Sequence, residues 1–117
     1  MDDETLLTQI YDALYQIGFK ANHSGFFYLS HAVFLCVRES DRWTSEMELW
    51  SAVAQHYHTT PQTVKTQLHA AVTTAWRIHK VQMKNKIGDR LDRQPSDTKI
   101  LAYLYRYVTG PGHAKRE

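Results

Sequence analysis

The sequence has little cysteine, no long apolar segment and, between residues 49 and 88, no acidic side chain. The single cysteine, Cys36, cannot form a disulfide within the chain, which fits a reducing compartment. The longest apolar segment, residues 25–37, is shorter than the roughly 18–20 residues that span a bilayer. The first residues, 1–7, are acidic where a secretory signal is basic. These absences argue against a secreted or membrane protein, and we expect a cytoplasmic one.

Motifs that commonly carry catalysis are also missing. The sequence contains no glycine-rich phosphate loop, no HExxH and no nucleophile elbow. His56 and His58 are the nearest pair of metal-ligand type, but no carboxylate or cysteine lies close to them in the sequence. Cys36 lies in a mostly apolar segment without an obvious base partner, so it is expected to be a core or near-core residue. The sequence therefore predicts no enzyme, no cofactor and no metal site.

Length and periodicity predict one all-helical domain. The 117 residues fit a single domain over residues 1–109, followed by a flexible tail at 110–117 that begins with Gly-Pro-Gly. No alternating run is long enough to predict a strand. Apolar residues instead repeat at helical spacing in six segments, at 3–17, 24–38, 45–57, 61–79, 81–87 and 97–108. We expect an all-α, compact six-helix domain.

The segment from 45 to 79 has the pattern of a helix-turn-helix. Ser45 followed by Glu48 is typical of a capping box, and Thr60-Pro61 is typical of a second helix start. The break at residues 58–60 is three residues long, as in a helix-turn-helix. His58 is a residue type that tolerates a positive φ at such a turn.

The charge distribution favours a polyanionic partner for this segment. Residues 1–48 carry eight acids and three bases, whereas residues 49–88 carry five Lys or Arg, four His and no acid. A basic, acid-free stretch is attractive to nucleic acid, although it is also compatible with a solvated face that has no partner.

One face of the second helix is left for DNA once its apolar stripe packs inward. Residues opposite Val64 and Leu68 are small and polar, which suits a major groove about 12 Å wide. The candidates for reading base edges are Gln62, Thr63, Thr66, His69 and Thr73. The candidates for contacting phosphates are Thr59, Thr60, Lys65, Arg77, Lys80 and Lys84.

Three stretches resemble a known family. They are IGFKANHSGFFYLSHAV (17–33), VAQHYHTTPQTVKTQLHAAVTTAW (53–76) and QPSDTKILAYL (94–104), within a resemblance that covers residues 5–108. The chain resembles the C-terminal effector domain of the master sporulation response regulator of bacilli and clostridia. The resemblance implies a six-helix fold with a helix-turn-helix that binds promoter DNA in the bacterial nucleoid, often as tandem copies. It also implies regulation of transcription, contact with a polymerase sigma subunit and a homodimer on DNA.

The sequence departs from that family in ways that bear on function. The family's recognition helix carries arginines and a glutamate where this chain has Thr63, Lys65, Thr66, His69, Ala70 and Thr73. The family's target sequence is therefore not carried over. The usual receiver domain is not present in this sequence, and residues 80–86 are more basic than the family's polymerase-facing segment.

An alternative is a protein-interaction or dimerisation module on the same fold, with weak or lost DNA binding. The candidate contacts for such a module are Trp43, Trp50, Tyr103 and Tyr105.

Overall fold

The computed structural model describes residues 2–88 and 92–110, and these residues form helices without any strand. In chain order the helices are α1 (Asp3–Gln16), α2 (Ser24–Arg38), α3 (Glu46–His56), α4 (Pro61–Ile87) and α5 (Asp97–Thr109). The predicted all-helical class is confirmed. Most of the predicted C-terminal tail, from residue 111 onward, lies outside the described residues.

Most helices begin where the sequence places a polar cap. The side chains of Asp2, Ser45, Thr60 and Ser96 each accept a hydrogen bond from a backbone N–H three residues later. In a capping box the carboxylate of Glu48 would accept from the N–H of Ser45. Here Glu48 Oε1 accepts instead from the N–H of the preceding residue, Thr44, at 3.0 Å. These local bonds satisfy N–H groups that have no partner within their own helix.

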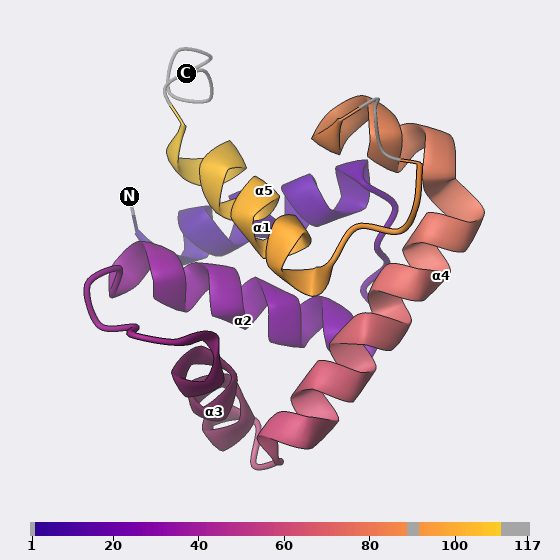
Figure 1. Cartoon of the computed structure of the whole chain (residues 1–117). Helices are drawn as coiled ribbons and strands as arrows, with labels where there is room; N and C mark the ends of the chain where they lie inside the picture. Colours follow the sequence, from indigo (N-terminus) through magenta and orange to yellow (C-terminus); the bar gives the residue numbers. More distant parts are fainter. Residues whose placement is uncertain (1, 89–91, 111–117) are drawn as a thin grey trace.

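The central helix of the core is α2. Its side chains Phe26, Leu29 and Val33 are almost fully buried, as expected for a helix that is apolar on nearly all sides. Figure 1 shows α1 and α5 on one side of α2, α3 on the other and α4 across its end. Because α2 contacts each of the other helices, it fixes the position from which α3 and α4 project.

The described residues form five helices and not the predicted six, because segments 61–79 and 81–87 run together across a kink as α4. No glycine or proline separates these segments. His79 alone has non-helical angles, with φ −121° and ψ 39°. At this kink His79 packs on Gly18, and the Nε2 of Gln82 donates to the carbonyl of Gln16 at 2.5 Å. The second part of α4 thus bends over the end of α1.

None of the helices in residues 2–88 and 92–110 is long and apolar enough to span a membrane.

Candidate nucleic-acid interface

A tight turn joins α3 to α4. The N–H of Thr59 donates to the carbonyl of Ala54 at 2.9 Å, and His58 has φ 57°. The positive φ predicted for His58 is confirmed, and only residues 57–60 separate the two helices. Thr60 Oγ1 accepts from the N–H of Thr63 at 3.1 Å, and Pro61 occupies the first helical position. The start of α4 is therefore well defined.

Burial divides the first part of α4 into two faces. Its inner stripe is almost fully buried and consists of Val64, Leu68, Ala71, Val72 and Ala75. Among the base-reading candidates, Gln62, Thr66 and His69 are exposed, while Thr63 and Thr73 are partly buried. Among the phosphate candidates, the exposed residues are Thr60, Lys65, Arg77 and Lys80, and the partly buried ones are Thr59 and Lys84. The polar face predicted for this helix is open to solvent at its first turns.

The segment before α5 closes the far end of this face. Gln94 Nε2 donates to Thr73 Oγ1 at 3.0 Å, and Asp97 Oδ1 lies 3.5 Å from His69 Nδ1. Sequence reasoning missed Gln94 and Asp97, since no local signal links either of them to residues that lie more than twenty positions earlier. The α4 stretch is acid-free in sequence, but in space one carboxylate borders it.

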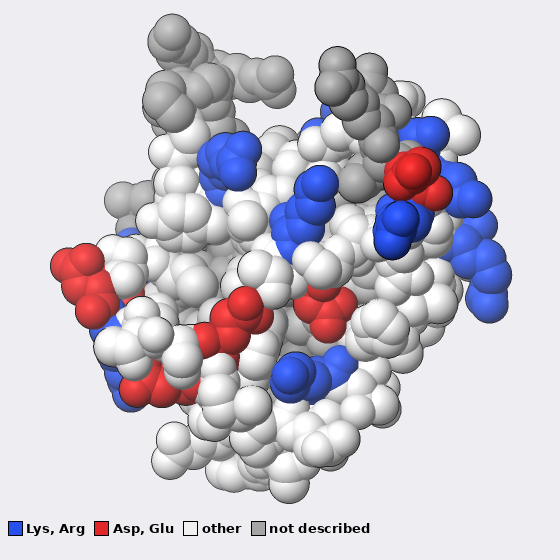
Figure 2. All heavy atoms as spheres, in the orientation of Figure 1, with Lys and Arg blue, Asp and Glu red and all other residues white. Residues whose placement is uncertain are grey.

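Basic side chains gather over the second part of α4. Figure 2 shows Lys and Arg along the right-hand edge, where Figure 1 places that part of the helix, and several acidic residues on the opposite side. The Lys80 ammonium lies 5.4 Å from the centre of the Trp76 ring, within cation–π range. The asymmetry of charge seen in the sequence is thus an asymmetry of the surface.

The histidines near the turn stack on each other. The rings of His31 on α2 and His56 on α3 have centroids 4.0 Å apart with an interplanar angle of 17°. Burial, and then the charge of His56, lowers the pKa of His31 to about 4. The stacked rings join α2 to α3, and the described residues contain no group of three ligand side chains placed to hold a metal ion. Burial also raises the pKa of the Cys36 thiol, which disfavours the reactive thiolate.

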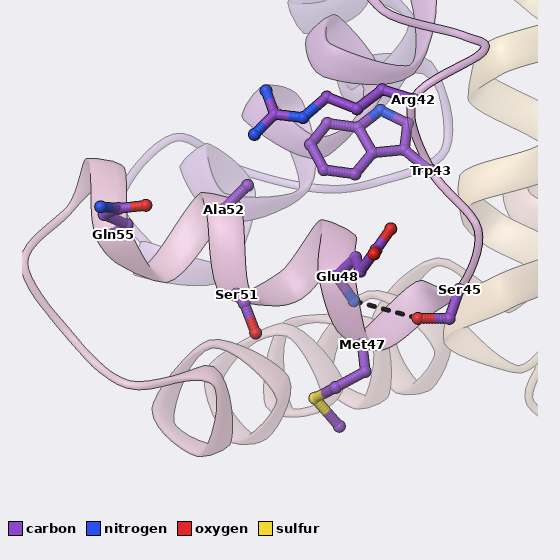
Figure 3. Close-up of a pocket in the computed structure, with 8 residues that line it drawn as sticks. All are labelled: Arg42, Trp43, Ser45, Met47, Glu48, Ser51, Ala52 and Gln55. Atoms are coloured by element: carbon purple, nitrogen blue, oxygen red, sulfur yellow. Dashed lines mark hydrogen bonds between the residues drawn. The ribbon is translucent and has the colours of Figure 1, made fainter.

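A separate groove of about 460 Å³ runs along the outer face of α3 (Figure 3). The guanidinium of Arg42 lies 4.7 Å from the centre of the Trp43 ring at one side of it. Met47, which also lines the groove, is one of the more exposed apolar side chains. The groove brings together no arrangement of acid, base and nucleophile.

The aromatic candidates for a protein contact are mostly covered. Trp50 is 3% exposed, Trp43 and Tyr103 are partly buried, and Tyr105 is exposed. The most exposed large apolar residues are instead Ile78 at 58% and Val81 at 71%, which flank the kink of α4. Exposed apolar side chains therefore lie at the kink, and a further groove of about 300 Å³ is lined by Trp43, Leu101 and Tyr105.

Comparison with known families gives a match over most of the chain. The family model described as "Sporulation initiation factor Spo0A C terminal" matches residues 10–108. The matched region includes the second half of α1, all of α2, α3 and α4, and nearly all of α5.

Proposed function

Because this chain belongs to the sporulation initiation factor Spo0A C-terminal family, we propose that it is a sequence-specific DNA-binding regulator of transcription. That family is a DNA-binding effector domain and not a class of enzyme. In the proposed arrangement α3 and the first part of α4 form the helix-turn-helix, and α4 enters the major groove. The observation that carries the proposal is the exposed, polar face of α4 opposite the buried stripe of Val64 and Leu68.

We assign base reading to the outer residues of the first turns of α4. Gln62 and Thr66 are exposed there, and the partly buried Thr63 lies between them. A glutamine amide can pair with the N6 and N7 atoms of adenine, and threonine can contact either a polar edge or the thymine methyl. Thr73 is already bonded to Gln94, so it has less freedom to contact a base than the residues before it.

Phosphate contacts are assigned to the start of α4 and to the basic residues along it. The exposed N–H groups of a helix N-terminus attract anions, and Lys65 lies one turn beyond this end. Arg77, Lys80 and Lys84 can reach phosphates farther along the duplex. Thr59 and Thr60 precede the helix, and the hydroxyl of Thr60 already caps it. Thr60 is therefore expected to position the helix start as much as to contact DNA.

Two partners besides DNA follow from the family and remain proposals: a second copy of the chain on DNA and a polymerase sigma subunit. In the family, the segment that corresponds to residues 80–86 faces the polymerase, so a sigma subunit bound here would contact this basic segment.

The salt dependence of binding tests the electrostatic part of the proposal. Affinity for duplex DNA is expected to fall about 10-fold or more between roughly 50 and 200 mM salt, because Lys and Arg side chains that contact phosphates release counterions from the DNA. Lys65→Ala should weaken binding to all duplexes alike and reduce the slope of log affinity against log salt by about 1. Arg106→Ala is the matched control, since it removes one exposed cation from the last turn of α5. Equal effects of the two variants would contradict the assignment.

The identity of the preferred sequence tests the base-reading part. Selection of bound duplexes from a random pool should give one preferred site for the unaltered protein. Gln62→Ala should relax the preference at one base pair by about 1–3 kcal/mol for a lost bidentate contact, and Thr66→Ala should relax it at a second base pair. An unchanged preferred site in both variants would show that this face does not read bases.

The second candidate function is a protein-interaction or dimerisation module, and the exposure of Ile78 and Val81 favours it. Binding through these apolar side chains would change little over the same salt range, because the burial of apolar surface is not screened by ions. The salt titration thus distinguishes the two functions directly.

A further inference from the structure

A carboxylate lies beside one of the base-reading candidates. Asp97 is the first residue of α5, and its Oδ1 is 3.5 Å from the Nδ1 of His69 on α4. The two side chains differ in exposure, at 65% for His69 and 24% for Asp97. A solvent-facing imidazole is therefore held against a largely covered carboxylate.

The carboxylate oxygen needs a donor. Asp97 Oδ1 is buried and has no hydrogen-bond partner among the described residues. A polar atom that is removed from water without a partner is costly, and charged groups are the most costly. The imidazole Nδ1 of His69 lies 3.5 Å from this oxygen, and a proton on Nδ1 supplies the missing donor. The proton of neutral His69 is thus favoured on Nδ1.

Placing the proton on Nδ1 determines what the other ring nitrogen can do. A neutral imidazole has one donor and one acceptor nitrogen, so Nε2 of His69 becomes an acceptor. In the major groove, cytosine N4 and adenine N6 are the amino donors, whereas guanine offers only acceptors and thymine an acceptor and a methyl group. Phosphate oxygens are acceptors as well, so the same tautomer does not favour the DNA backbone.

We infer that Asp97 is a positioning residue for recognition: it holds His69 as the Nδ1–H tautomer, so that Nε2 accepts a hydrogen bond from the amino group of cytosine or adenine. The DNA half of this inference rests on the proposed function, whereas the tautomer is a property of the free protein. A purely structural role of Asp97 at the start of α5 would leave the base preference unchanged.

The tautomer can be measured without DNA. Nitrogen–proton correlation spectra of the imidazole rings, recorded near pH 8, above the ordinary histidine pKa of about 6.5, distinguish Nδ1–H from Nε2–H. We expect Nδ1–H for His69 in the unaltered chain and a shift toward Nε2–H in Asp97→Ala. Asp12→Ala is the control, since it removes one exposed carboxylate from α1 and should leave His69 unchanged. An Nε2–H tautomer in the unaltered chain would overturn the inference, and that spectrum is decisive even if Asp97→Ala does not fold.

The base preference tests the second half. His69→Ala identifies the base pair that His69 contacts, as the position where discrimination is lost in the selected duplex. Four duplexes with each base at that position should then show a preference for the amino-bearing base of roughly 2- to 10-fold, the range of one net hydrogen bond. Asp97→Ala should lose this preference and Asp12→Ala should keep it. The base-reading role is refuted if guanine is preferred at that position, or if His69→Ala loses discrimination at no base pair. Either result leaves DNA binding itself intact. Failure to bind any duplex counts instead against the proposed function, and the tautomer result stands independently.

Discussion

Gly25 marks the closest approach of α2 to α4, and its replacement by alanine is expected to destabilise the fold. A Cβ atom at this position would lie 2.6 Å from the carbonyl oxygen of Gln67 and 2.7 Å from the Cβ of Ala71. Both atoms belong to the middle of α4 and neither is the flexible end of a long side chain. The methyl group can therefore be accommodated only if the helices move apart.

Two opposing effects determine the size of the loss. Alanine has a higher helix propensity than glycine, which favours the variant by up to about 1 kcal/mol. Overpacking a tight contact typically costs about 1–3 kcal/mol, and a backbone oxygen at this distance places Gly25 at the upper end of that range. We expect the free energy of unfolding to fall by about 1–2 kcal/mol in Gly25→Ala.

Urea denaturation of the full chain measures this change, and the chain offers a matched control. Gly88, at the end of α4, has no atom within 4 Å of the position of an added Cβ and has φ 169°, an extended conformation open to any residue. Gly88→Ala should therefore change stability by no more than about 0.5 kcal/mol. If Gly25→Ala is as stable as the unaltered chain, the close packing of α2 on α4 is refuted, and with it the fixed position of the outer face of α4.

Two further predictions concern the elements around the turn. Thr60→Ala should lower the free energy of unfolding by about 1 kcal/mol through loss of the cap to Thr63, whereas Thr60→Ser should retain it; equal urea midpoints would contradict the capping role. Burial, and then His56, lowers the pKa of His31 to about 4 in the fold, against about 6.5 in the unfolded chain. Because the unfolded chain binds this proton more readily, the free energy of unfolding is unaffected by His31 ionisation above about pH 6.5 and falls as the pH drops toward about 4. His31→Gln should remove roughly 1–2 kcal/mol of the stability lost between about pH 7.5 and 4.5, after allowance for partial exposure, while His23→Gln at an exposed site should not; the same pH dependence in both variants would disprove this origin.

The sequence was most informative where the deciding interactions are local. A helix cap involves residues only three apart, so Ser45 and Thr60 could be assigned from sequence alone. The positive φ of His58 follows from the short break before Thr60-Pro61. The inner face of α4 follows from the spacing of its apolar residues.

Long-range contacts could not be derived in this way. The sequence placed a helix end at residue 79, but nothing in the residues around His79 indicates that the chain bends there against Gly18, sixty-one positions earlier, and continues as a helix. The contacts of Thr73 with Gln94 and of His69 with Asp97 likewise depend on where the start of α5 packs. The sequence thus predicted the residues of the candidate face but not the carboxylate that borders it.

The rigidity of α4 bears on which function its surface can serve. Its inner side is fixed on α2 by the close contact at Gly25 and by the buried side chains of Val64 and Leu68. The exposed polar face of α4 on the opposite side therefore has a defined position. Reading a base edge requires polar groups held to within a fraction of an ångström, which a rigid helix provides and a loop does not. By contrast, Ile78 and Val81 are only two exposed apolar side chains, and a stable protein interface buries about 800 Å² on each partner. The surface at the kink would therefore need many additional contacts to serve as a protein interface, whereas the first turns of α4 already present a defined polar row.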